Sequence, residues 1–256
     1  MACLPAGRFK SIWAHPPERH MQKKMKQLIA LAEERMKSSH DKVHDDGHAR
    51  RVVQHAKDIS HSFILSSNQK QALILAAWWH DTGRTIIKKP SVVWMRAVDD
   101  ALSAFLLWKA SLQLKLISQK VNTALRIIIC KNFGTSRIFT KILLRKKDRI
   151  LLDILNDADG LDVLCLERLE QMRLFAKISK TNRFKYKMVV WWFMHSKEFH
   201  FRTNIAKINF EIIFNNFIVW LKEKEIYRWH AENFSQWWIE KNIMKARSIL
   251  KKIKTI

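Results

Sequence analysis

The sequence contains little glycine, proline or cysteine, and each shortage excludes a class of protein. Its 256 residues include five glycines and four prolines, too few for the many tight turns of a β-rich fold. Its three cysteines, Cys3, Cys130 and Cys165, form no CxxC pair and no even framework, which predicts a reducing, cytoplasmic location without disulfides. No apolar run approaches the roughly 20 residues that cross a bilayer, so we expect neither a membrane span nor a membrane partner.

Hydrophobic residues are abundant and follow a helical period. They make up 48% of the chain, which indicates a folded protein and, with so few turn residues, an all-α fold. The stretch 71–80 is apolar almost all round and predicts a buried central helix, and 148–171 indicates one further helix. We expect a flexible leader over residues 1–20, a helical domain over 21–180, and a C-terminal extension over 181–256 whose two or three long helices pack aromatic rings on the core.

Acidic residues are scarce, with 23 Asp and Glu against 47 Lys and Arg and a net charge of +24. Such a field attracts polyanions, including nucleic acid and nucleotides. The basic runs over 137–149, 173–187 and 241–254 do not alternate with aromatics as a nucleic-acid platform does. We therefore interpret most of the charge as solvated surface, with nucleic acid as a second possible partner. An anionic substrate gains from the field under either interpretation.

Three short clusters of histidine and carboxylate contain three of the five glycines. Glycine beside such clusters indicates sharp backbone turns at one site, and only a fold can bring clusters so far apart in sequence together. The clusters are His44-Asp-Asp-Gly-His48 followed by Arg51-Val52, His80-Asp81-Thr-Gly-Arg84, and Asp157-Ala-Asp159-Gly-Leu-Asp162.

Four of these side chains are the expected ligands of a metal. His80-Asp81 follows the buried run 71–80, where a carboxylate needs a charge partner because burying it unpaired costs several kcal/mol. His48 lies in the first turn of a helix that Asp45 or Asp46 is expected to cap, and Asp159 lies among core-like neighbours. Two imidazoles and two carboxylates suit Mn(II), Fe(II), Zn(II) or Mg(II).

The order and spacing of these clusters resemble the HD-domain superfamily of metal-dependent phosphohydrolases. The match covers about residues 22–175 and is most similar to the small bacterial members that hydrolyse nucleotides. It departs from the family at Arg84, where Lys is usual, and at Gly160, where Arg is usual. The matching elements are His48 with Arg51-Val52, the doublet His80-Asp81 with Thr82-Gly83-Arg84, and Ala158-Asp159-Gly160-Leu161.

The resemblance implies an HD-type helical bundle over residues 21–180 that holds one divalent ion, with Mn favoured. Its ligands would be His48, His80, Asp81 and Asp159. Relatives with two metals carry extra histidines after the doublet, and this chain has none between His80 and His195. One metal favours release of phosphate or pyrophosphate from a nucleotide, through a water activated by the metal.

Further residues receive roles around this centre. Arg84 and Lys131 would neutralise the charge of a substrate phosphate, and the guanidinium of Arg84 can bind two of its oxygens. His44 and Asp45 would position water or the leaving group. We therefore predict His44, Asp45 and Arg84 as catalytic residues.

The third cluster offers a choice between aspartates. Asp157 and Asp159 point roughly 200° apart on a helix, so both cannot face one metal. Asp159 matches the family pattern, which makes Asp157 a cap or a supporting residue rather than a ligand. Asp162 is expected to be structural.

Two other interpretations stay open. His44 and His48 form an H-x-x-x-H pattern, but zinc peptidases need Glu directly after the first histidine, and Asp45 stands there. Alternatively, the motifs are vestigial and the chain is a catalytically impaired basic module that binds nucleic acid or a nucleotide. Stoichiometric metal in the purified protein would count against this alternative. The sequence leaves the oligomeric state and the substrate open.

Overall fold

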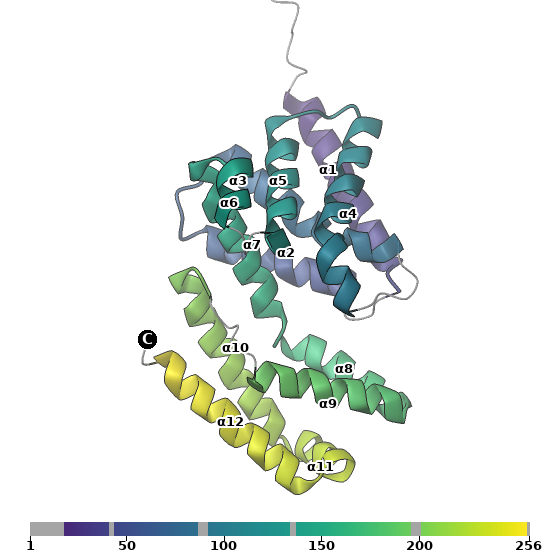
Figure 1. Ribbon diagram of the computed structural model, residues 1–256, viewed down its shortest axis with the longest axis vertical. Helices are drawn as coiled ribbons and strands as arrows, with labels where there is room; N and C mark the ends of the chain where they lie inside the picture. The colour runs from purple at the N-terminus through teal and green to yellow at the C-terminus, as the bar shows by residue number, and fades with distance from the viewer. Residues whose placement is uncertain (1–17, 41–43, 87–91, 134–136, 196–200, 255–256) are drawn as a thin grey trace, which may run out of the picture.

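The computed structural model describes residues 18–40, 44–86, 92–133, 137–195 and 201–254. Within these ranges the chain is helical and contains no strand, so the all-α prediction is confirmed. Most of the predicted leader, residues 1–17, lies outside the described ranges. Figure 1 shows two stacked groups of helices, which we call the N-terminal half (α1 to α7) and the C-terminal half (α8 to α12).

In the N-terminal half, the other helices surround the buried helix α3. Helix α3 contacts α1, α2, α4, α5 and α7, and its residues from Leu75 to Trp79 are buried, as its all-round apolar sequence predicts. The elements are α1 (Glu18–Lys37), α2 (Asp46–Ser60), α3 (Ser67–Trp79), the 3-10 turn η1 (Thr82–Ile86), α4 (Val92–Gln113), α5 (Gln119–Phe133), α6 (Arg137–Leu143), η2 (Lys146–Asp148) and α7 (Arg149–Asp162).

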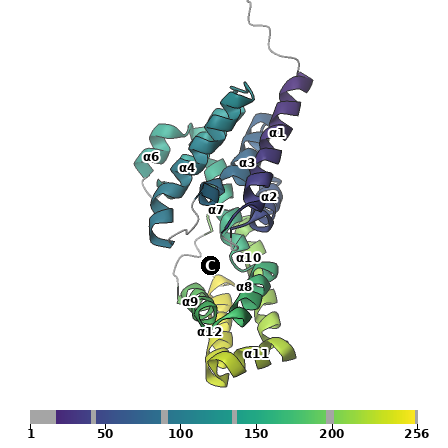
Figure 2. The same ribbon diagram turned by 90° about the vertical axis from the view of Figure 1, so that its right-hand side faces the viewer.

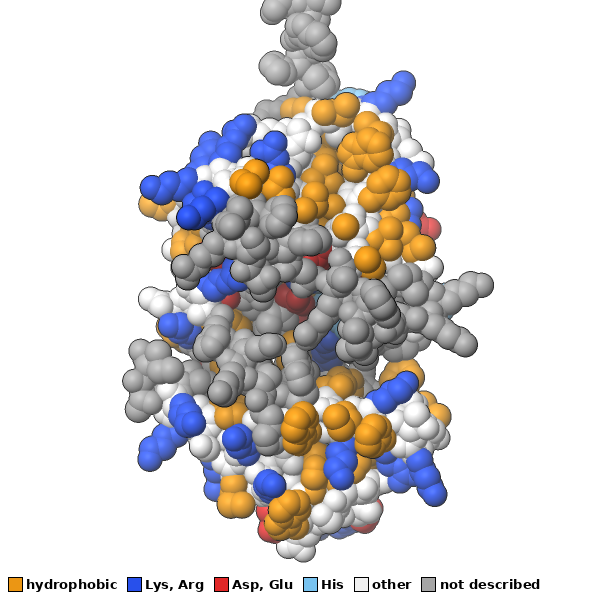
Figure 3. Space-filling view, viewed as in Figure 1, with side chains coloured by type: hydrophobic (Ala, Val, Ile, Leu, Met, Phe, Trp, Pro, Cys, Tyr) orange, Lys and Arg blue, Asp and Glu red, His pale blue; other side chains and the backbone are white. Residues whose placement is uncertain are grey.

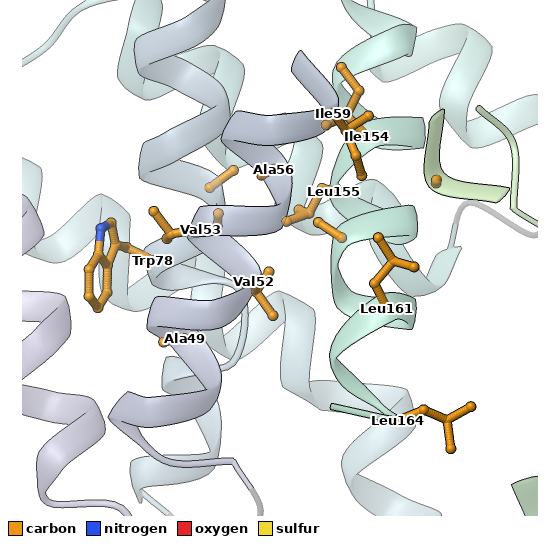
Figure 4. Close-up of a cluster of buried hydrophobic side chains, with 14 of the residues drawn as sticks. Ala49, Val52, Val53, Ala56, Ile59, Trp78, Ile154, Leu155, Leu161 and Leu164 are labelled. Atoms are coloured by element: carbon orange, nitrogen blue, oxygen red, sulfur yellow. The ribbon is translucent and has the colours of Figure 1, made fainter. Parts of the chain in front are cut away.

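Helices α2 and α7 pack along each other and carry two of the three histidine and carboxylate clusters. Val52 and Ile59 of α2 meet Ile154 and Leu155 of α7 in a fully buried core (Figure 4). Burying an aliphatic side chain of this size stabilises the fold by roughly 1.5–3 kcal/mol. This packing fixes the register of the two helices, and with it the positions of the polar residues beyond the core.

The C-terminal half is a second bundle, stacked end-on against the first (Figure 2). Within it α8 packs on α9 and α10, and α10, α11 and α12 contact one another, while α10 also contacts α7. The helices are α8 (Leu166–Ile178), α9 (Lys180–His195), α10 (Asn204–Lys222), α11 (Lys224–Phe234) and α12 (Gln236–Lys254). No described helix is long and apolar enough to span a bilayer.

The structure differs from the sequence prediction in two boundaries and in the number of C-terminal helices. The single helix expected over 148–171 is two, because α7 ends at Asp162 and α8 starts at Leu166. The boundary expected at residue 180 falls between α8 and α9, which pack together in the C-terminal half. From Lys180 onward the described residues form four helices rather than two or three. Extended backbone at Glu223 and the positive φ of Ser235 interrupt them without glycine or proline.

Gly83 is the one glycine of the site whose lack of a side chain the packing requires. A Cβ there would lie 2.7 Å from the Asp99 carbonyl oxygen and 3.1 Å from the Leu102 Cβ, both in α4. The η1 turn that follows His80-Asp81 can approach α4 this closely only because residue 83 is glycine.

Candidate metal centre

His48 is held in one orientation by the start of α2 and by α7. Asp45 caps α2, and its Oδ1 accepts the His48 backbone N–H at 3.1 Å. The ring is fully buried, and its Nδ1 lies 2.7 Å from Asp162 Oδ2. Because a carboxylate only accepts, Nδ1 carries the hydrogen and Nε2 points to the other side.

His80 ends α3 and is oriented in the same way. Its Nδ1 lies 2.8 Å from the Ala77 carbonyl oxygen, so it donates there and leaves Nε2 directed away from the helix. The two Nε2 atoms of His48 and His80 are 3.3 Å apart. Fixing the far nitrogen of each imidazole in this way is how proteins orient metal-binding histidines.

Two carboxylates complete the cluster. Asp81 Oδ2 lies 3.2 Å from His48 Nε2 and 3.5 Å from His80 Nε2. Asp159 Oδ1 lies 3.5 Å and 3.7 Å from the same two nitrogens. Ligands about 2.1 Å from one ion, at tetrahedral or octahedral angles, are about 3.0–3.4 Å apart. The Nε2 atoms of His48 and His80 and one oxygen of Asp159 lie within 4.8 Å of one another, so these three side chains could hold a divalent ion, and Asp81 lies beside both imidazoles.

Lys131 of α5 stands beside the two carboxylates. Its Nζ lies 2.8 Å from Asp159 Oδ2 and 3.6 Å from Asp81 Oδ1. Burial raises the pKa of both carboxyls, but the charges of Lys131 and His80 outweigh burial and hold each pKa well below its ordinary value. Burial by itself lowers the pKa of the Lys131 ammonium, but the charges of Asp159 and Asp81 outweigh burial and raise this pKa above its ordinary value. The acids are thus ionised and the lysine is charged.

Asp162 supports His48 from behind and is itself held by two arginines. Arg168 Nη1 lies 2.9 Å from Asp162 Oδ2, and the Arg51 Nε also donates to this carboxylate. Burial raises the pKa of Asp162, but His48 and Arg168 outweigh it and lower the pKa. Burial lowers the pKa of His48, and the hydrogen bonds to Asp162 and Asp81 raise it above its ordinary value.

Arg168 is a site residue that the sequence did not reveal. It lies in α8, the first helix of the C-terminal half, and its side chain is buried. In one continuous helix, positions 162 and 168 would point roughly 240° apart. The break after Asp162 allows them to meet, and no glycine or proline marks that break.

His44 and Arg84 lie at the accessible edge of the cluster. His44 Nε2 is 3.9 Å from Asp81 Oδ2, and His44 Nδ1 is 3.3 Å from Arg84 Nη1. Arg84 Nε lies 2.6 Å from Asp99 Oδ2 of α4. Burial, reinforced by the charge of Asp81, raises the pKa of Asp99 to about 8 against the attraction of Arg84. The sequence prediction missed Asp99, and the two adjacent acids Asp99 and Asp100 in a largely apolar stretch are the signal that could have indicated it.

Comparison with known proteins found no relative of this chain. Neither a protein-family model, a curated protein nor a solved structure matches this chain. Its functional interpretation therefore depends on its own sequence pattern and on the geometry of the cluster.

Two further aspartates of the histidine and carboxylate clusters, Asp45 and Asp157, accept hydrogen bonds at the starts of helices. Asp45 caps α2, as described above, and so positions His48 through the backbone. Asp157 accepts hydrogen bonds from the Arg202 N–H at 2.9 Å, the Thr203 N–H at 2.8 Å and the Thr203 hydroxyl at 2.7 Å. These contacts direct Asp157 to the start of α10, which is the position of a cap rather than of a ligand.

Solvent reaches the cluster at a few side chains only. The side chain of Asp159 is 28% exposed and that of His44 is 21% exposed, whereas both candidate histidine ligands are fully buried. A cavity of about 320 Å³ is separate from the cluster and lies by Arg126 and Arg145 at the opposite end of α7. Figure 3 shows acidic side chains where the two halves meet. Any substrate of the cluster would bind on this partly exposed edge.

Proposed function

We propose that this protein is a divalent-metal-dependent phosphohydrolase of the HD type. One observation carries the proposal: the Nε2 atoms of His48 and His80 and an oxygen of Asp159 lie within 4.8 Å of one another, Asp81 Oδ2 lies 3.2 Å and 3.5 Å from the same two nitrogens, and both imidazoles have their Nδ1 hydrogen committed elsewhere. Because two His and two Asp leave further coordination positions for water and substrate, such a donor set suits hydrolysis. The pattern His48, His80-Asp81 and Asp159 that resembles the HD superfamily supplies exactly these four donors.

The remaining side chains then have separate tasks. A divalent ion bound here would polarise a phosphoryl oxygen and lower the pKa of its water. His44, near Asp81 and partly exposed, is placed to pass a proton to the leaving group. Arg84 and Lys131 would balance the charge of the phosphate, while Asp99 and Asp159 hold their cationic groups in position. Asp45 acts through the cap of α2.

A nucleotide is the substrate class that we propose, acted on in the cytoplasm. The net charge of +24 attracts a phosphorylated substrate, and the cysteines in the described residues, Cys130 and Cys165, are both free thiols. Free thiols are usual in a reducing compartment.

Metal analysis of the purified chain, followed by phosphate release from a panel of nucleotides with Mn(II), Mg(II) or Ni(II), tests the proposal. We expect about one ion per chain and metal-dependent release. His80→Ala and Asp81→Asn should abolish release while circular dichroism stays unchanged, because each removes one of the four donors. His61→Ala is the matched control, since His61 lies exposed just after α2. Full turnover in both ligand variants would refute the metal assignment.

The alternative is a basic module that binds nucleic acid without turnover, and the charge of +24 is the observation that favours it. If the positive charge is spread over the surface and forms no dedicated binding site, RNA and DNA should bind weakly and lose affinity steeply with added salt. Such binding is mainly counterion release. Tight, salt-resistant, sequence-selective binding without metal-dependent hydrolysis would favour the binding module over the enzyme.

A further inference from the structure

Helices α8 and α9 form a hairpin that exposes large apolar side chains. On α8, Leu174, Phe175 and Ile178 lie opposite the buried face of Leu169 and Ala176. Ile178 at the end of α8 is 73% exposed. Each of these three side chains is therefore at least 41% exposed to solvent.

Helix α9 continues the same kind of surface. Phe184, Met188 and Trp191 are spaced by four and three residues and are exposed, while Tyr186 and Val190 on the other face are buried. Spacing of this kind places three side chains in one stripe along a helix. We call the six residues Leu174, Phe175, Ile178, Phe184, Met188 and Trp191 the hairpin apolar surface.

Between Glu170 and Glu198 the sequence carries charge of one sign. No Asp or Glu occurs between these two residues, whereas seven Lys or Arg residues lie in that stretch. Arg173 is buried and pairs with Glu170. Four lysines are exposed and form no ion pair with a described residue, namely Lys177, Lys180, Lys185 and Lys187. Figure 3 shows hydrophobic and Lys or Arg side chains side by side over the C-terminal half.

Basic charge around exposed apolar side chains can meet either an anionic lipid surface or a nucleic acid. Nucleic-acid platforms use aromatic rings, because only a π face stacks on a base. Half of the hairpin apolar surface is Leu174, Ile178 and Met188, which have no ring and cannot stack. Aliphatic side chains do partition among acyl chains, and lysines beside them contact anionic headgroups. The chemistry of this surface therefore favours lipid.

We propose that the α8–α9 hairpin docks the protein on an anionic lipid bilayer, with the hairpin apolar surface inserted at the headgroup level and the four lysines on the headgroups. Docking of this kind needs no spanning helix. The prediction of no membrane partner depended on the lack of a spanning segment and did not consider a surface assembled from two helices.

Co-sedimentation of the full chain with vesicles tests the proposal. We expect binding to vesicles of phosphatidylcholine with 30% phosphatidylserine, on the order of tenfold or more above binding to phosphatidylcholine alone. The double variant Ile178→Ser and Phe184→Ser should lower binding at least about tenfold, because it removes inserted apolar area. Ile64→Ser with Ile142→Ser is the matched control, since both are exposed isoleucines in the N-terminal half. The control should bind as the wild type does.

The charge is tested in the same way. Lys185→Gln with Lys187→Gln should lower binding about 25-fold, at about fivefold for each lysine. Lys57→Gln with Lys70→Gln, both exposed on the N-terminal half, should change it little. Equal losses in the two pairs would overturn the proposal, because binding would then follow the diffuse charge of the whole protein.

A second result would also overturn it. If the wild type binds single-stranded RNA but not the anionic vesicles, and the Ile178 and Phe184 variant loses the RNA, the hairpin is a nucleic-acid surface. Both outcomes are independent of the metal centre, because none of the substituted residues contacts it.

Discussion

The two halves of the molecule bury different kinds of side chain. The N-terminal half encloses charge: His48, Asp81, Asp99 and Asp162 are almost inaccessible to solvent. The C-terminal half encloses rings, among them the run Phe210, Phe214, Phe217 and Trp220 along α10, whose successive centroids are 5.2–6.1 Å apart. Ring packing of this kind stabilises a fold beyond the area that it buries, whereas buried charge is costly unless every member is paired.

Histidine makes the contrast within one residue type. His48 and His230 are both fully buried. Carboxylates raise the pKa of His48 over the opposing effect of burial. His230 lies among Tyr186, Trp229 and Trp238, accepts the Tyr186 hydroxyl at 2.9 Å, and burial lowers its pKa to about 4. The carboxylates around His48 favour a positive charge at that position, whereas the apolar surroundings of His230 favour a neutral ring.

The largest loss of stability is expected where the N-terminal half has most charge to balance. Asp162→Ala leaves Arg51 and Arg168 without their shared carboxylate, which should cost about 3–5 kcal/mol in the free energy of unfolding. Urea denaturation measures it. Asp153→Ala is the control, because it removes only the half-exposed pair with Arg202 and should cost less than about 1 kcal/mol. Equal losses would mean that the Asp162 network is not a buried charge cluster in solution.

Acid should weaken the C-terminal half through His230. Its folded pKa of about 4 lies below its ordinary value of 6.5, so its contribution is present above pH 6.5 and is lost as the pH falls toward 4. The shift corresponds to roughly 3 kcal/mol. Between pH 7 and pH 4 the wild type should lose about that much more unfolding free energy than His230→Gln, which cannot titrate. Parallel pH profiles for the two proteins would contradict the assignment.

Packing at Gly83 should give a smaller effect. In Gly83→Ala the new Cβ would collide with the Asp99 carbonyl oxygen at 2.7 Å, and such overpacking costs typically about 1–3 kcal/mol. Gly160→Ala is the control, because its Cβ would meet only the Phe201 ring at 3.3 Å and alanine favours the helix. Thermal unfolding should rank Gly83→Ala clearly below Gly160→Ala, and the reverse order would refute the close approach of η1 to α4.

The smallest change in stability is expected for substitutions of Asp157 and Asp159 in α7. Asp157 bonds to the start of α10 in the C-terminal half, whereas Asp159 belongs to the candidate metal centre of the N-terminal half. Asp157→Asn weakens the hydrogen bonds to α10 by about 1–2 kcal/mol and should leave metal content and hydrolysis unchanged. Asp159→Asn should remove both. Metal analysis and phosphate release check the pair. If Asp157→Asn loses the metal and Asp159→Asn keeps it, the register of α7 is wrong by about half a turn.

The sequence predicted what local periodicity encodes. It identified the buried helix α3 and narrowed the cap of α2 to Asp45 or Asp46, of which Asp45 is the cap, and its motifs selected His48, His80, Asp81 and Asp159, which the fold brings together. It did not predict the break after Asp162, because Val163 and Leu164 continue an apolar pattern. Arg168 was missed for the same reason. Distances between helices depend on tertiary packing, and the spacing of residues along one helix does not determine them.

Arg168 also constrains how this protein can change over evolution. A gene that lost or exchanged everything after α7 would keep all four candidate ligands but would leave Asp162, fully buried, with one fewer of its arginine partners. Of the two arginines that hold the carboxylate behind His48, only Arg51 would then remain. The C-terminal half is therefore not a detachable module, and its first helix should be inherited together with the centre that it supports.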